Sequence, residues 1–149
     1  MTNTLYDALI APHAQSDRPF MEIDDGTILS YADFVRRAAQ LAHVLVGAGV
    51  TPGDRVVVQA PKVADAIALY AACVEAGAVY LPLNTAYTQA ELSYFIEDAS
   101  PRIVVCDSKD EAALTTLCAP FGATVLTLGA DGTGTLPAAA DTAPDQFET

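Results

Sequence analysis

The sequence predicts an α/β fold in which a mostly parallel sheet is flanked by helices, with a β-hairpin near the N-terminus. Short apolar runs of strand length alternate with longer stretches of helical periodicity, the pattern of βαβ units. Glycine, proline and helix-capping residues stand at the junctions between these stretches. A hydrophobic content of 52% in 149 residues is sufficient for the buried core of one domain.

The first predicted element is a hairpin formed by residues 20–23 and 27–29. Between these strands lies Asp24-Asp25-Gly26, and glycine at such a position tolerates the positive φ of a tight turn. Two neighbouring acids could also suggest a catalytic pair. A solvated turn explains them better, because short acidic side chains accept hydrogen bonds from the backbone of a turn.

A helix is predicted to begin at Ser30, because Asp33 stands at the position that completes a capping box. Arg36 and His43 lie on the polar face of this helix. We therefore expect His43 to be a surface residue rather than a ligand, and Arg36 and Arg37 to be solvated charges. Apolar residues recur at helical spacing along the opposite face: Phe34, Ala38, Leu41, Leu45 and Ala48.

Strands and helices then alternate. Residues 55–59 form a valine-rich strand, residues 63–76 an alanine-rich helix pressed against the sheet, and residues 79–81 a second apolar strand. Thr88 and Glu91 make a second capping box, which predicts a helix that ends at Pro101. Its buried stripe consists of Leu92, Phe95, Ile96 and Ala99.

The remaining elements complete an α/β region that we assign to residues 1–128. Residues 103–106 and 124–128 are strands, and Ser108 with Glu111 repeats the capping-box pattern at the start of the intervening helix. Residues 129–149 are poor in large apolar side chains and rich in Gly, Ala, Thr and Pro. We predict that they form a linker or flexible tail, with no helix starting after its glycines.

The charge balance excludes several classes of partner. Seven Lys and Arg against nineteen Asp and Glu give a formal net charge of -12. Such a chain repels polyphosphate backbones and anionic membrane surfaces, so nucleic acid and membranes are not expected as partners. The first residues lack the basic and apolar regions of a signal peptide, and a cytoplasmic location is predicted.

The cysteines and histidines suggest neither a metal centre nor a nucleophile. Cys73, Cys106 and Cys118 are odd in number and form no C-x-x-C pair, so we interpret them as buried free thiols. His13 and His43 lie far apart in the sequence, without a Cys or carboxylate cluster beside them. We therefore assign no metal ligand and no Cys–His pair.

Two glycine clusters resemble phosphate-binding loops only in part. Gly47-Ala48-Gly49 ends a helix and has Pro52 where the dinucleotide fingerprint needs its third glycine. Gly129, Gly132 and Gly134 follow a strand but precede no Lys-Ser/Thr pair. Neither cluster is assigned a cofactor.

Ligands of open α/β sheets bind beyond the carboxyl ends of the strands. In this chain that edge includes residues 82–85 with Tyr87, and Asp107-Ser108. Asn84 is nevertheless expected to satisfy backbone groups of a turn, and Tyr80 and Tyr87 to be packing rings. We assign no catalytic residue among them.

Two stretches resemble motifs of a known enzyme family. LSYADF at 29–34 and CVEAGAVYLPLN at 73–84 are similar to the first two core motifs of the adenylate-forming, or AMP-binding, superfamily of acyl-CoA synthetases, luciferases and peptide-synthetase adenylation domains. GAVYLPLNTAYTQAELSYFIEDASPRIVVCD at 77–107, and the segment 126–132, are most similar to malonyl-CoA synthetases. The resemblance spans about residues 5–136 and implies part of the N-terminal domain of such an enzyme.

The resemblance implies a ligase reaction of fatty acid metabolism in the parent enzyme, with ATP, Mg²⁺ and coenzyme A. A carboxylate attacks ATP to give an acyl adenylate and pyrophosphate, and the thiol of coenzyme A then displaces AMP. This chemistry needs a phosphate loop with a lysine, Mg²⁺ and a lysine on a mobile domain. Lys62 and Lys109 match neither lysine, so we assign no catalytic, cofactor-binding or metal residue here. We expect these parts to lie beyond Thr149 and the chain alone to be inactive.

Two alternatives stay open. The parent could act on another short or aromatic acid, or the chain could be a stand-alone, non-catalytic binding module with the same fold. As a fragment it is expected to expose apolar surface and sheet edges, and therefore to self-associate. A malonate pocket would use an arginine fork for the second carboxylate, but that role cannot be assigned to any arginine of the chain: Arg18, Arg36, Arg37, Arg55 or Arg102.

Overall fold

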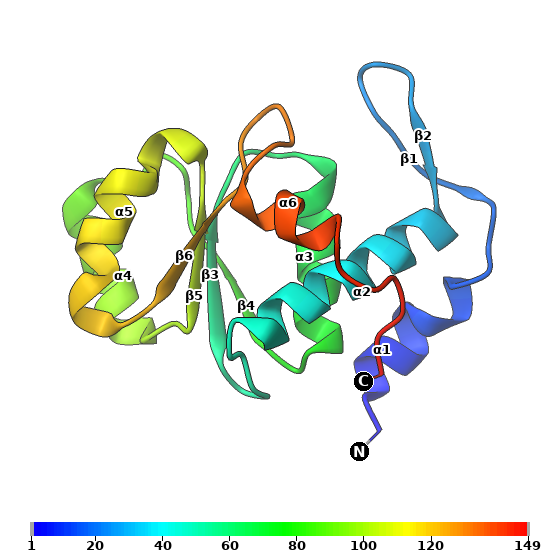
Figure 1. The fold of residues 1–149 in the computed structure, drawn as a ribbon, viewed down its shortest axis with the longest axis horizontal. Helices are drawn as coiled ribbons and strands as arrows, with labels where there is room; N and C mark the ends of the chain where they lie inside the picture. Colours follow the sequence, from blue (N-terminus) through cyan, green and yellow to red (C-terminus); the bar gives the residue numbers. More distant parts are fainter. Residues whose placement is uncertain (1, 149) are drawn as a thin grey trace.

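The computed structural model describes residues 2–148, which form two sheets and the helices around them (Figure 1). No helix in this range is both long enough and apolar enough to cross a membrane. The strands are β1 (Pro19–Glu22), β2 (Ile28–Ser30), β3 (Arg55–Gln59), β4 (Val79–Pro82), β5 (Ile103–Cys106) and β6 (Thr124–Thr127). The helices are α1 (Thr4–Leu9), α2 (Tyr31–Gly47), α3 (Ala64–Glu75), α4 (Gln89–Ala99), α5 (Glu111–Cys118) and α6 (Thr135–Ala140), with 3-10 turns at Ala11–His13, Ser108–Asp110 and Ala119–Phe121.

The larger sheet is parallel throughout and has the strand order β4-β3-β5-β6. Helix α3 connects β3 to β4, α4 connects β4 to β5, and α5 connects β5 to β6. Parallel neighbours need such crossovers, because a short turn cannot return the chain to the same end of the sheet. The predicted α/β class with a mostly parallel sheet is therefore confirmed.

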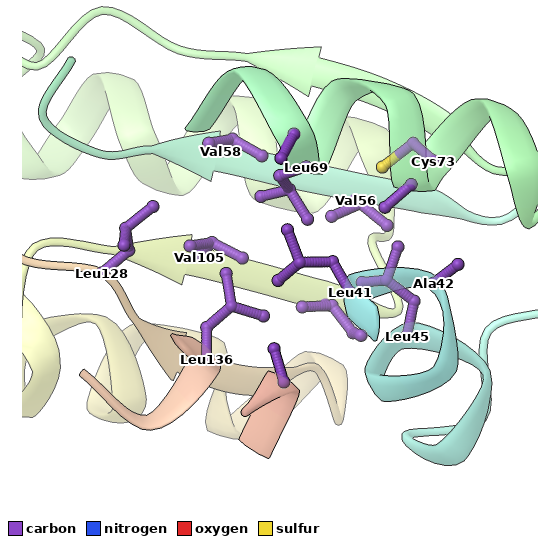
Figure 2. Close-up of a cluster of buried hydrophobic side chains, with 14 of the residues drawn as sticks. Leu41, Ala42, Leu45, Val56, Val58, Leu69, Cys73, Val105, Leu128 and Leu136 are labelled. Carbon is purple, nitrogen blue, oxygen red and sulfur yellow. The ribbon is translucent and has the colours of Figure 1, made fainter. Parts of the chain in front are cut away.

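Successive residues of the central strands fill separate cores on the two faces of the sheet. Val56 and Val58 of β3 lie in the core beneath α2, α3 and α6, whereas Val57 lies in the core beneath α4 and α5. Figure 2 shows the first of these cores, where Leu41 and Leu69 converge on the sheet. Burial on both faces explains why β3 is a continuous valine run rather than an alternation.

The N-terminal hairpin is confirmed, since β1 and β2 pair antiparallel. Asp25 acts as a turn residue, accepting a hydrogen bond from the backbone N–H of Thr27 (2.8 Å). The capping box of α2 also forms: the backbone N–H of Asp33 donates to Ser30 Oγ (3.1 Å), and the N–H of Ser30 donates to the Asp33 carboxylate (2.9 Å). These bonds satisfy N–H groups that the first turn of a helix leaves unpaired.

Of the other two expected capping boxes, one forms and one does not. Thr88 accepts a hydrogen bond from the N–H of Glu91 (3.3 Å), and the Glu91 carboxylate accepts one from the N–H of Thr88 (2.7 Å). The box expected at Ser108 and Glu111 is wrong. Asp107 already caps a 3-10 turn by accepting from the N–H of Lys109 (3.3 Å), so Ser108 lies inside that turn and α5 starts without a side-chain cap.

A helix follows the glycines after β6, and the expectation that none starts there is wrong. Gly134 has φ +146°, and the next residue, Thr135, exchanges hydrogen bonds with Thr127 of β6. The N–H of Thr135 donates to Thr127 Oγ1 (2.8 Å), and the N–H of Thr127 donates to Thr135 Oγ1 (2.9 Å). These bonds return the chain to the sheet, so that Leu136 is buried in the core shown in Figure 2. The domain boundary after residue 128 stays a prediction.

The polar face of α2 binds the segment that follows α6. The Arg37 guanidinium donates to both carboxylate oxygens of Asp65 (2.8 and 2.7 Å) and to Asp141 (2.8 Å). His43 Nε2 hydrogen-bonds the carbonyl oxygen of Gln146 (2.7 Å), and Phe147 packs edge-on against its ring. The expectation that Arg37 is a solvated charge is wrong, because Asp65 of α3 and Asp141 after α6 both accept hydrogen bonds from its guanidinium.

Candidate functional site

A groove lies at the carboxyl ends of β3 and β4, the edge of the sheet at which the sequence predicts a ligand. Its volume is about 790 Å³. The lining comes from the end of β3, from α3, and from β4 with the loop that follows it, residues 83–85. The groove is mostly apolar, which is typical of sites for small organic molecules.

A buried amide fixes one wall of this groove. Gln59, the last residue of β3, is only 5% exposed, and its Nε2 donates to the carbonyl oxygen of Asn84 (2.9 Å). The Asn84 side chain accepts from the N–H of Ala86 (2.9 Å), so it serves the turn as expected. The N–H of Leu83 donates to Val58 O (2.9 Å). The loop after β4 is therefore held to the end of β3 by two hydrogen bonds.

The tyrosines near the edge are packing rings, as expected. Tyr80 meets Tyr70 of α3 in a T-shaped contact with ring centroids 5.5 Å apart, and both rings line the groove. Tyr87 stacks on Phe95 of α4 with centroids 5.1 Å apart. Burial raises the pKa of Tyr80 above its usual value, so its phenol stays protonated at neutral pH.

The rest of the carboxyl edge is occupied by local hydrogen bonds. Asp107, after β5, caps the turn described above, and its carboxylate lies 3.9 Å from the ammonium of Lys109. After β6 the hydroxyls of Thr127 and Thr135 bond each other's backbone N–H groups. These polar groups therefore support the loops at the edge.

The groove at this edge carries little positive charge. Among residues 2–148, Lys62 is the one basic residue that lines the groove, and Lys109 is already near a carboxylate. A bound triphosphate needs several cationic groups or a ring of backbone N–H donors. Within residues 2–148, no cluster of three or more His, Cys, Asp or Glu residues is arranged to hold a metal ion.

The three cysteines are buried and free, which confirms the prediction. Burial raises the pKa of the Cys73 thiol to about 12 and that of Cys106 to about 12. The pKa of Cys118 is raised by burial as well. Because the thiolate is the reactive form, these thiols are inert packing groups at neutral pH.

The histidines do not meet at a site. His13 packs against Tyr31 with ring centroids 4.8 Å apart, while His43 binds the segment after α6. The polar residue that the sequence analysis missed is Gln59, the tie between two strand ends. A polar side chain at the end of a buried valine run is the signal that could have found it, because a buried amide needs a partner.

Comparison with known protein families identifies one family along nearly the whole chain. The family described as AMP-binding enzyme matches residues 10–148. Among curated relatives, feruloyl-CoA synthase of Amycolatopsis sp. is 38% identical over 98 residues, which are 66% of this chain and 19% of that protein. Enterobactin synthase component F of Escherichia coli K12 is 34% identical over 123 residues, 77% of this chain and 9% of that protein.

The fold closely matches a solved structure. MatB from Rhodopseudomonas palustris, a malonyl-CoA synthetase, superposes on all of this chain with a TM-score of 0.95 and 46% sequence identity. The same values hold for its ATP-bound form. The chain covers 30% of MatB, and it spans less than a fifth of the length of each of the two curated relatives described above.

Proposed function

This chain belongs to the AMP-binding enzyme family, and we propose that it is the N-terminal part of an ATP-dependent acyl-CoA synthetase of the malonyl-CoA synthetase type. The observation that carries the proposal is the likeness to MatB, at 46% identity and a TM-score of 0.95 over the whole chain. Fold alone carries no function, but identity at this level over every element is also a likeness of sequence.

The proposed reaction of the parent enzyme joins malonate to coenzyme A. A carboxylate oxygen of malonate attacks the α-phosphorus of ATP, which forms malonyl adenylate and releases pyrophosphate. The thiol sulfur of coenzyme A then attacks the activated carbonyl, releases AMP and forms malonyl-CoA. Mg²⁺ neutralises charge on the phosphates in such transfers.

The role we propose for the described residues is structural support of that site. The hydrogen bond from Gln59 to Asn84 and the pairing of Thr127 with Thr135 hold the loops at the carboxyl edge. Among the residues that the structure describes, Lys62 is the one basic residue lining the groove, and we infer that the groups that stabilise the phosphate oxyanions come from other parts of the parent enzyme.

The first experiment tests whether this chain acts alone. The 149-residue chain is incubated with malonate, ATP, Mg²⁺ and coenzyme A, and pyrophosphate release is followed. We expect no release above the enzyme-free rate, and the product of the complete coding sequence that contains these residues is the positive control. Turnover by the 149-residue chain would show that the phosphate-binding groups lie within it.

The second experiment tests the acid. The likeness to feruloyl-CoA synthase, 38% identical over 98 residues, supports an aromatic acid as the competing substrate. Thioester formation by the complete coding-sequence product is measured with malonate and with ferulate at equal concentrations. We expect kcat/KM for malonate to be higher by at least about tenfold, since a site that pairs a second carboxylate rejects acids that lack one.

Three results of this comparison are informative. Preference for ferulate would show that the substrate is an aromatic acid rather than malonate, while the proposed type of reaction would stand. Activity with neither acid, together with failure to release pyrophosphate with a panel of other acids, would favour a non-catalytic binding module. Preference for malonate supports the proposal in its present form.

A further inference from the structure

Glu75, the last residue of α3, is a buried carboxylate that the proposed function does not use. The residue is 3% exposed. Both carboxylate oxygens are out of contact with solvent, and neither has a hydrogen-bond partner within residues 2–148. An ionised carboxylate in such surroundings is strongly disfavoured, because it has lost water and gained no donor.

Helix α1 covers this carboxylate and is held on α3 by few contacts. Asn3, the N-cap of α1, donates from Nδ2 to the carbonyl oxygen of Val74 (2.6 Å). Tyr6 packs against a small core that includes Ile10 and Ala71, and its hydroxyl lies near Glu75 without forming a regular hydrogen bond. No residue of α1 itself is fully buried. Helix α1 can therefore detach without opening the main core.

Within residues 2–148, no basic side chain lies in the lining around Glu75 that could compensate its ionisation. The ionisable groups that α1 contributes are Tyr6 and Asp7. A neighbouring cavity of about 700 Å³ is lined by residues from the chain start, α2 and the loop after it, the end of α3 and the loop before β4, and the C-terminal segment. Its ionisable lining residues among 2–148 are Glu75 and Glu148, and neither Lys, Arg nor His lines it.

We propose that Glu75 makes the docking of α1 proton-dependent, so that α1 stays on α3 while Glu75 is protonated and detaches when it ionises. Detachment admits water to the carboxylate, which removes the cost of ionising it under cover. The proposal concerns the N-terminal segment and is independent of which acid the parent enzyme activates.

The direction of the pH dependence follows from the two protonation equilibria. Burial raises the pKa of Glu75 from 4.5 to about 7, so the docked state holds the proton more tightly than the open state. Docking is then strongest below pH 4.5 and weakens as the pH rises from 4.5 to about 7. Above about pH 7 it stays at its weakest. Between pH 5 and pH 8 the docking equilibrium constant should fall by roughly ten- to a hundredfold.

Amide hydrogen exchange of the chain measures this equilibrium. The N–H groups of Asp7 and Ile10 donate to Asn3 O (2.8 Å) and Tyr6 O (2.9 Å), and they exchange when α1 opens. Protection factors, which are corrected for the intrinsic effect of pH on exchange, should fall by the stated ratio between pH 5 and pH 8. The protection of Val57 in β3 should not follow this fall.

Two variants separate Glu75 from other causes. Glu75→Gln cannot ionise, so its α1 protection should be independent of pH in this range. Asp7→Asn removes an exposed acid of α1 and should keep the wild-type fall. A fall of equal size in Glu75→Gln, or no fall in the wild-type chain, would overturn the proposal.

A direct titration keeps the proposal testable if Glu75→Gln fails to fold. The side-chain carboxyl ¹³C resonance of Glu75 in the wild-type chain is followed by NMR from pH 4 to pH 9. A midpoint raised above the 4.5 of a hydrated glutamate supports the covered carboxylate, and detachment of α1 on ionisation places this midpoint between 4.5 and about 7. A midpoint near 4.5 shows that the carboxylate is not covered.

Discussion

Gly134 turns the chain after β6 so that α6 can reach the sheet. Its φ of +146° lies in a region that side chains with a Cβ rarely adopt. A Cβ at this position would also overlap the carbonyl oxygen of Thr127, which belongs to the neighbouring strand backbone and cannot move aside. The burial of Leu136 therefore depends on glycine at this point.

Replacement of Gly134 by alanine should destabilise the protein by about 3 kcal/mol, since backbone strain and overlap add. Gly132→Ala is the matched control, because Gly132 also has positive φ (+79°) but a Cβ added there would meet no atom within 4 Å. Gly132→Ala should lower the free energy of unfolding by about 1 kcal/mol. Urea unfolding curves of both variants measure the difference, and equal costs would contradict this account.

Arg36 and Arg37 are neighbours in the sequence but differ in their ion-pair partners. Arg37→Ala should lower the free energy of unfolding by about 2 kcal/mol, because it leaves the Asp65 carboxylate, 16% exposed, without its partner. Arg36→Ala removes an exposed pair with Asp33 and should cost below about 0.5 kcal/mol. Thermal unfolding at low and high salt checks both values. A larger cost for Arg36→Ala would be inconsistent with the packing seen here.

The contrast between these arginines shows where sequence reasoning reaches its limit at the residue scale. Periodicity placed Arg36 on the polar side of α2, and both Arg36 and Arg37 were expected to be solvated charges; for Arg36 that is sufficient. The partners of Arg37 come from α3 and from the segment after α6, residues 65 and 141, which no local pattern brings together. The role of Gln59 could not be predicted for the same reason, since its partner Asn84 lies beyond the next crossover.

At the scale of elements, two sequence patterns of the capping-box type lead to different structures. Thr88 accepts the N–H of Glu91 at the start of α4, whereas Ser108 occupies a 3-10 turn that Asp107 already caps. Thr88→Ala should therefore lower the free energy of unfolding by about 1 kcal/mol. Ser108→Ala should change it by less than about 0.5 kcal/mol. Chemical denaturation measures the free energy of unfolding of both variants. An equal loss in Ser108→Ala and Thr88→Ala would indicate that the capping box predicted at Ser108 does form.

Helix α6 could not be predicted because its start has no local signal. Gly134 is a weak N-cap, and Pro137 and three alanines give a short helix with little amphipathic pattern. Its stability comes from Leu136 and Ala140 in the core and from the bonds between Thr127 and Thr135. The elements that were predicted, such as β3 and α2, carry their signals within their own residues.

At the scale of the whole molecule, the pattern of crossovers was enough to predict the parallel sheet and the edge where a groove lies. Alternation of short apolar strands with helices allows few other arrangements. The chemistry of the groove was not predictable, because it depends on which loops meet there. The hydrogen bond from Gln59 to Asn84 forms only when β3 and β4 are paired. The same pairing places Lys62 in the lining of the groove.

The edge of the larger sheet at β4 should make the chain associate with itself. Within residues 2–148, β4 pairs only with β3, so its other side presents unpaired backbone groups. Val79 of β4 is 48% exposed, and on α3 Ile67 and Tyr70 are 48% and 47% exposed. An edge strand flanked by apolar side chains is a template for pairing with a second chain.

Sedimentation velocity over a range of concentrations should show a monomer–dimer equilibrium. Val79→Lys places a charge on the edge strand and should shift the equilibrium to monomer by at least about tenfold in dissociation constant, since a lysine there would be desolvated on pairing. Tyr94→Lys is the matched control, because Tyr94 is 66% exposed on α4, across the sheet from α3. If Tyr94→Lys abolishes association and Val79→Lys leaves it intact, the contact lies on α4 and the edge of β4 is protected by its twist or its shortness.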